Sequence, residues 1–116
     1  MNIQKRRAVA YIVGRLISNR DSTAVFDYNT SSYSNYGGDL NNPNVNIFDY
    51  QRGCYISGDI KSFFDYGSGM YINLQITGED FSGFDYETGT HFSGTVRSNS
   101  ISFFDYQDSQ YYSYSI

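Results

Sequence analysis

The sequence predicts an all-β protein of about eleven short antiparallel strands, built from five β-hairpin repeats that form a closed up-and-down barrel. Three observations favour this fold class. The tripeptide Phe-Asp-Tyr occurs five times, starting at residues 26, 48, 64, 84 and 104. Each copy is followed, five residues after its tyrosine, by a further aromatic ring. No segment combines an apolar period of 3.6 with capping residues, so we expect essentially no helix.

The first twenty residues combine positive charge with a short apolar run. They contain no acidic residue and five basic ones, Lys5, Arg6, Arg7, Arg15 and Arg20. Residues 11–16 (Tyr-Ile-Val-Gly-Arg-Leu) match residues 55–60 (Tyr-Ile-Ser-Gly-Asp-Ile), and this match predicts a strand at 11–16. We interpret the basic residues as a solvated, poorly ordered terminus, with an electrostatic handle for anionic partners as the alternative.

The second aromatic of each unit sets the repeat boundaries. Aligning on it gives a half unit and five complete units within one domain, residues 1–116. The units cover residues 11–32, 33–54, 55–70, 71–90 and 91–110, with a closing strand at 111–116. The spacing from Phe to the second aromatic is constant, while the return to the next Phe varies. This combination is typical of a tight hairpin followed by adjustable loops.

Glycine marks the turn of three hairpins. Gly53, Gly69 and Gly89 occupy equivalent positions between the paired aromatics, where a primed or bulged turn requires positive φ. A two-residue turn places Tyr106 opposite Tyr111 on one side of the ribbon. A bulged turn shifts this pairing by one residue, and the sequence leaves both registers open.

Closure of the sheet is expected because an open meander leaves its first and last strands unpaired. The half unit at the start resembles the second strand of every hairpin, which makes it a suitable neighbour for the last strand. Two other arrangements remain open, namely hairpins set radially as in a propeller or trefoil, and a β-solenoid with one coil per repeat. The solenoid is disfavoured because parallel coils would stack the five motif aspartates.

Composition argues against several functional classes. Of eight basic and twelve acidic residues, five basic and no acidic ones lie in residues 1–20, which leaves three basic and twelve acidic residues for the rest. Such an acidic body argues against nucleic-acid binding. Cys54 is the only cysteine, so no intrachain disulfide forms, and a reducing, cytoplasmic location is favoured. No apolar run approaches about 18 residues, so we expect no membrane span.

The motif aspartates have two interpretations. Each one immediately precedes a turn whose backbone N–H groups can donate to its carboxylate. A metal site would instead need several carboxylates to converge on one point. We favour structural turn capping and expect neither a metal nor another cofactor. The residues concerned are Asp27, Asp49, Asp65, Asp85 and Asp105.

The repeated rings also have two interpretations. Core packing accounts for them if the tyrosine hydroxyls reach water at the rim. Thirteen tyrosines nevertheless exceed what packing needs, so some rings are candidate stacking platforms for a ligand. The candidate ligand-binding residues are those at the second aromatic position, Tyr33, Tyr55, Tyr71, His91 and Tyr111.

His91 stands where the other complete units have tyrosine. It lies close in sequence to Asp85, Ser82 and Ser93, which suggests a hydrolase-like arrangement as a third hypothesis. No Gly-x-Ser-x-Gly turn accompanies these residues. We therefore identify no catalytic residue and do not expect an enzyme.

Several segments resemble a group of small bacterial proteins. The segments are residues 54–58 (Cys-Tyr-Ile-Ser-Gly), 91–94 (His-Phe-Ser-Gly), 99–102 (Asn-Ser-Ile-Ser) and 111–116 (Tyr-Tyr-Ser-Tyr-Ser-Ile). Through them nearly the whole chain resembles function-unassigned β-repeat proteins with Tyr-Asp-Tyr or Phe-Asp-Tyr repeats, some of which look like integron gene-cassette products. The resemblance implies a bacterial protein and carries no activity or functional residue with it.

These observations favour a non-enzymatic binding or interaction module. Its aromatic face would take a small molecule, a glycan or a protein partner. The alternative is a self-associating structural protein, in which unpaired strand edges join copies into a homo-oligomer.

Overall fold

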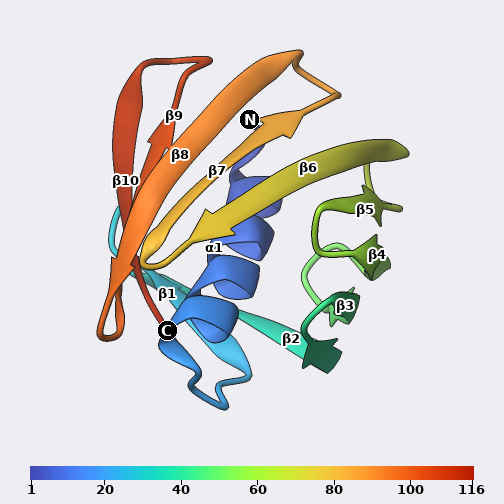
Figure 1. The fold of residues 1–116 in the computed structure, drawn as a ribbon, viewed down its shortest axis with the longest axis horizontal. Helices are drawn as coiled ribbons and strands as arrows, with labels where there is room; N and C mark the ends of the chain where they lie inside the picture. The colour runs from blue at the N-terminus through green and yellow to red at the C-terminus, as the bar shows by residue number, and fades with distance from the viewer.

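The protein is a closed barrel of ten antiparallel strands wrapped around one helix, as the computed structural model of residues 1–116 shows (Figure 1). Every strand pairs with its sequence neighbour, and β1 closes the sheet by pairing with β10. The predicted closed barrel is therefore confirmed, with ten strands instead of about eleven, and the radial and solenoid alternatives are wrong. The strands are β1 (Ala24–Asp27), β2 (Ser32–Asn41), β3 (Asn44–Asp49), β4 (Cys54–Asp59), β5 (Ser62–Asp65), β6 (Met70–Thr77), β7 (Asp80–Asp85), β8 (Thr90–Arg97), β9 (Ser100–Asp105) and β10 (Gln110–Ser115).

The N-terminal segment is a helix, so three predictions are wrong: essentially no helix, a strand at 11–16, and a poorly ordered basic terminus. Helix α1 (Ile3–Ser18) runs through the barrel, and its residues 5–14 are all buried. Asn2 caps its start by accepting from the Gln4 N–H at 2.8 Å. The barrel wall surrounds the middle of the helix on every side, so this part has no solvent-facing stripe and hence no amphipathic period. The apolar run therefore resembled a buried strand.

The hairpins turn through four residues, which differs from both registers considered above. Phe104 pairs with Tyr111 and Asp105 with Gln110, so residues 106–109 form the loop. The fourth residue after each motif aspartate has positive φ, namely Ser31, Gly53, Gly69, Gly89 and Ser109. In this conformation the Gly53 N–H donates to the Asp49 carbonyl at 2.8 Å, which closes the turn. Glycine suits the position because it lacks a Cβ.

The interior is filled by the helix and by large side chains that alternate along the strands. Tyr11 of α1 stacks on Tyr36 of β2, with ring centroids 4.4 Å apart. Several of the buried phenylalanines are paired with a glycine on the neighbouring strand. Phe81 pairs with Gly94, and a Cβ on Gly94 would lie 2.5 Å from the Phe81 ring. The barrel therefore holds a packed core in place of an internal ligand cavity. Helix α1 also falls short of the length and apolar character that a membrane crossing needs.

Candidate binding surface on the outside of the barrel

The five motif aspartates lie inside the barrel at one end, and only 0–1% of the surface of each residue is exposed to solvent. Strand alternation causes this placement, because each Asp follows an outward Phe at the end of an odd-numbered strand. Every one of these carboxylates accepts a hydrogen bond from the backbone N–H two residues later, at 2.8–3.2 Å. The donors are Asn29, Gln51, Gly67, Glu87 and Gln107.

Cations from the helix and from one turn neutralise this buried acidic ring. Lys5 contacts Asp85 at 2.6 Å, and Arg7 contacts Asp27 at 2.8 Å. The Asp105 carboxylate pairs with the Met1 ammonium group at 3.0 Å and with Arg6 at 3.5 Å. Arg52 bridges Asp49 and Asp65, at 2.8 Å and 2.9 Å. All five carboxylates are therefore paired with cations inside the wall and face away from solvent.

Burial alone would raise the pKa of Asp27, but its hydrogen bonds reverse the effect. The Arg7 guanidinium and the backbone and side-chain amides of Asn29 together hold the pKa of Asp27 below its ordinary value of 3.8. The charged carboxylate is therefore the form that the folded protein stabilises.

The outer surface at the same end carries five clusters of three rings, one for each repeat, which together we call the aromatic belt. Each motif Phe lies between the Tyr two residues later and the aromatic seven residues later. The ten ring pairs have centroids 4.6–5.2 Å apart and interplanar angles of 59–81°, as edge-to-face packing favours. The fifteen belt residues are Phe26, Tyr28, Tyr33, Phe48, Tyr50, Tyr55, Phe64, Tyr66, Tyr71, Phe84, Tyr86, His91, Phe104, Tyr106 and Tyr111.

The tyrosine rings of the belt are exposed to solvent although most of each ring is apolar. The nine belt tyrosines expose between 47% of Tyr86 and 71% of Tyr111, while the five phenylalanines are half-buried beneath them. The candidate ligand-binding residues named from the sequence all lie on this belt, but they are spread around the barrel and do not converge on one pocket. The tyrosines of the tripeptide itself were not among those candidates. The sequence does contain a pattern that could have identified them, since each lies two residues after the motif Phe and residues two apart on a strand share a face.

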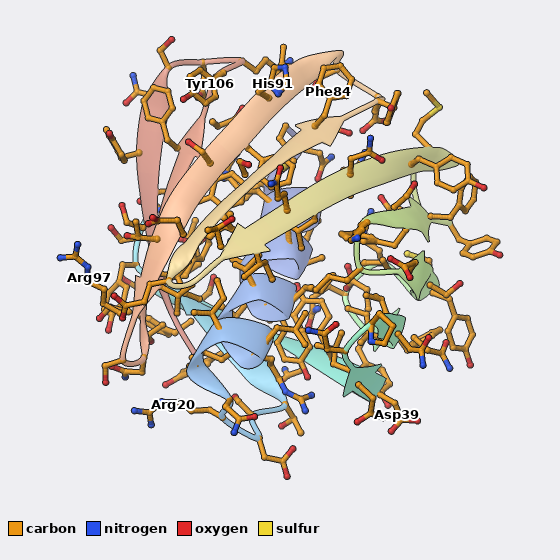
Figure 2. The ribbon with its side chains drawn as sticks, in the orientation of Figure 1. Arg20, Asp39, Phe84, His91, Arg97 and Tyr106 are labelled. Atoms are coloured by element: carbon orange, nitrogen blue, oxygen red, sulfur yellow. The ribbon has the colours of Figure 1, made fainter.

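Four grooves lie on the outside of the barrel, mainly over β5–β10, and each is lined by at least one belt residue. The groove beside Phe84 also reaches Asn42 of the β2–β3 turn and Lys61 of the β4–β5 turn. The groove beside Tyr71 and Tyr86 measures about 340 Å³ and the groove beside Phe84 about 720 Å³. The next two measure about 500 Å³ and 680 Å³ and lie on either side of Tyr106. Figure 2 shows Phe84, His91 and Tyr106 following one another along this rim. The grooves therefore place rings beside hydroxyl and amide side chains.

The hydrolase-like arrangement does not form. His91 points outward beside Ser82 and Ser93, whereas Asp85 points inward, where it accepts hydrogen bonds from Lys5 and Thr88. Burial, as the largest cause, also raises the pKa of the Cys54 thiol, which disfavours a nucleophilic thiolate. No three His, Cys, Asp or Glu side chains group in a way that could hold a metal ion.

No protein-family model matches the chain, and neither the curated proteins nor the solved structures contain a match to it.

Proposed function

We propose that the protein is a non-enzymatic binding module that holds its ligand or partner on the outside of the barrel, against the aromatic belt. The observation that carries this proposal is the exposure of nine belt tyrosines while the core is filled by α1. Large rings kept in contact with water forgo the stabilisation of about 1.5–3 kcal/mol that burial gives each side chain. A surface that repeats exposed tyrosines over a half-buried phenylalanine in five units is suited to contact a ligand or a partner protein.

Tyrosine suits such a surface because one ring offers both an apolar face and a hydroxyl group. The belt rings are also held in place before any ligand arrives. Asn73 donates to the Tyr86 hydroxyl at 3.0 Å, and each motif Phe supports its two neighbours by edge-to-face contact. Rings that are already ordered lose less conformational entropy on binding.

The self-association alternative depended on unpaired strand edges at the ends of an open sheet, and the sheet is closed. Neither terminal strand lacks a neighbour, because β1 pairs with β10 through Phe26 and Asp27. Copies therefore have no open sheet end to extend. Association of copies through the belt would be one form of the binding function proposed above.

Intrinsic fluorescence tests the proposal directly, because the chain contains thirteen tyrosines and no tryptophan. Titration with panels of metabolites, glycans and candidate proteins should change the tyrosine emission for at least one class. Replacing Tyr86 and Tyr106 with Ala should weaken that interaction, whereas Asp21→Asn, a fully exposed position away from the belt, should leave it unchanged. Saturable binding that ignores every belt substitution would overturn the proposal.

A further inference from the structure

We infer that the β5–β10 part of the aromatic belt is a track for a linear, uncharged, β-1,4-linked oligosaccharide. This inference rests on the proposed function and names the ligand class of the same surface. The first step is the continuity of the four grooves. Asn73 lines both of the first two, Ser82 and His91 line both the second and third, and Ser93 and Tyr106 line both the third and fourth. A ligand can therefore pass from one groove to the next without leaving the surface.

The chemistry of the track fits an uncharged, hydroxyl-rich ligand. Between the rings lie amide side chains, Asn73 and Gln75, and hydroxyl side chains such as Ser82 and Ser93. Apart from the tyrosines, the ionisable side chains that line these grooves are Lys61, Asp80 and His91. Phosphate-bearing ligands need several cations. A sugar ring, in contrast, offers C–H groups to an aromatic face and hydroxyls to amides.

Spacing selects the type of chain. Equivalent belt rings recur every second strand, which is a separation of about 10 Å because neighbouring strands lie about 4.8 Å apart. This separation is close to the length of one disaccharide. In an extended β-1,4-linked chain every second sugar presents the same face to the same side. Such a chain can therefore place equivalent sugar faces on the successive rings Tyr86 and Tyr106.

The phenol groups on the track keep a free donor. The Tyr86 hydroxyl accepts from Asn73 at 3.0 Å, and the Tyr106 hydroxyl accepts from Ser93 at 3.4 Å. In both cases the tyrosine O–H itself makes no hydrogen bond in the protein. Each ring is thus oriented by its neighbour on the preceding strand while its own proton can be donated to a sugar hydroxyl.

The opposite side of the belt supplies a matched control. There Tyr50 lies directly over Gly37, where an added Cβ would be 2.6 Å from the Tyr50 hydroxyl oxygen. Gly37 presents no side chain that could contact a sugar, whereas Asn73 takes the equivalent place on the track. Tyr50 and Tyr86 occupy the same position of their repeats and are both exposed. Replacing each with Ala therefore compares the loss of a ring outside the track with the loss of the equivalent ring on the track.

The experiment titrates the full chain with cellohexaose, mannohexaose and cellobiose, and with hexagalacturonic acid as the charged comparison, by calorimetry and tyrosine fluorescence. We expect a neutral hexasaccharide to bind more tightly than cellobiose and than the charged sugar. Tyr86→Ala or Tyr106→Ala should weaken binding about tenfold, Asn73→Ala should weaken it less, and Tyr50→Ala should leave it unchanged. Circular dichroism checks that each variant keeps its fold.

The glycan inference and the proposed binding function would be contradicted by different results. If no neutral hexasaccharide binds, but a charged sugar, a metabolite or a protein binds and Tyr86→Ala or Tyr50→Ala weakens it, the glycan inference is overturned and the belt remains a binding surface. The inference is also overturned if Tyr50→Ala weakens hexasaccharide binding as much as Tyr86→Ala does. If no ligand class responds to any belt substitution, both proposals are overturned.

Discussion

Lys5 Nζ of the central helix donates a hydrogen bond of 2.6 Å to Asp85 Oδ1 of the barrel wall, and both side chains lie at 0–1% exposure. The two residues are eighty positions apart in the chain. Their contact fixes the depth and rotation of α1 in the barrel, because a buried charge can be satisfied only by a partner at the right place.

Replacing Lys5 with Met should destabilise the protein by about 3–5 kcal/mol, since it leaves the Asp85 carboxylate buried without its cation. Urea unfolding followed by circular dichroism measures the change. The double variant Lys5→Met with Asp85→Asn should recover much of the loss, because neither position then holds an unpaired charge. Asp21→Asn, at a fully exposed carboxylate that pairs with Arg15, should leave the unfolding free energy nearly unchanged, because solvent screens this pair. Equal losses in the single and double Lys5 variants would refute this account.

The folded state should lose stability in acid partly through Asp27. Its pKa is lower in the folded protein than the ordinary 3.8, so the folded state binds fewer protons than the unfolded state. The contribution is fully present above about pH 5 and is lost as the pH falls through the folded pKa. Asp27→Asn should therefore flatten the dependence of unfolding free energy on pH below about pH 4. An unchanged acid profile in this variant would contradict the prediction.

Two buried tyrosines should respond oppositely to removal of the hydroxyl group. The Tyr36 hydroxyl is buried without a hydrogen-bond partner, so Tyr36→Phe should be neutral or should stabilise the protein by about 1 kcal/mol. The Tyr114 hydroxyl accepts from Arg6 Nε at 2.9 Å, so Tyr114→Phe should cost about 1.5–3 kcal/mol. Thermal and urea unfolding compare the pair. A loss at Tyr36 as large as that at Tyr114 would mean that the Tyr36 hydroxyl is satisfied.

The turn after β9 should be improved by glycine. Ser109 has a φ of 56°, the conformation that Gly53, Gly69 and Gly89 adopt at the equivalent position. Because a side chain is strained there, Ser109→Gly should stabilise the protein by about 1 kcal/mol. Ser102→Gly, within β9, should instead cost about 0.5–1 kcal/mol through lost backbone order. Both effects appear as shifts of the unfolding midpoint, and a destabilised Ser109→Gly would show that the serine side chain contributes to the turn.

Much of the barrel could be predicted from local sequence. The constant spacing within each unit specifies a hairpin, because the turn and the pairing of its two flanking strands involve residues close together in the chain. The alternation around Phe104 and Asp105 likewise places the ring and the carboxylate on opposite faces of the strand, although it leaves open which face lies inside. The register was less accessible, since a four-residue turn is closed by backbone hydrogen bonds to Asp49 and its equivalents that no side-chain pattern reports.

The candidate surface was partly visible as well. Tyr33, Tyr55, Tyr71, His91 and Tyr111 were named because tyrosine exceeded the needs of packing, and all of them lie on the belt. The grooves were not accessible, because each is formed by residues of several strands, such as Asn73 and His91. Their shape depends on which side chains the closed sheet brings together.

The sequence by itself determined the repeating hairpin and the separation of each motif Phe and Asp onto opposite faces, because these follow from the two-residue period of a strand and from the glycine conformation of a turn. Which of the two faces lies inside was decided by the tertiary structure, since the buried face is the one that packs on α1. Only the tertiary structure decided the helix inside the barrel. A segment enclosed on all sides carries no solvent-facing stripe, and the partners of Lys5, Arg6 and Arg7 are aspartates contributed by distant repeats. The basic residues of the first segment and the motif aspartates of the strands form buried ion pairs with one another. These pairs can form only when the barrel closes around α1.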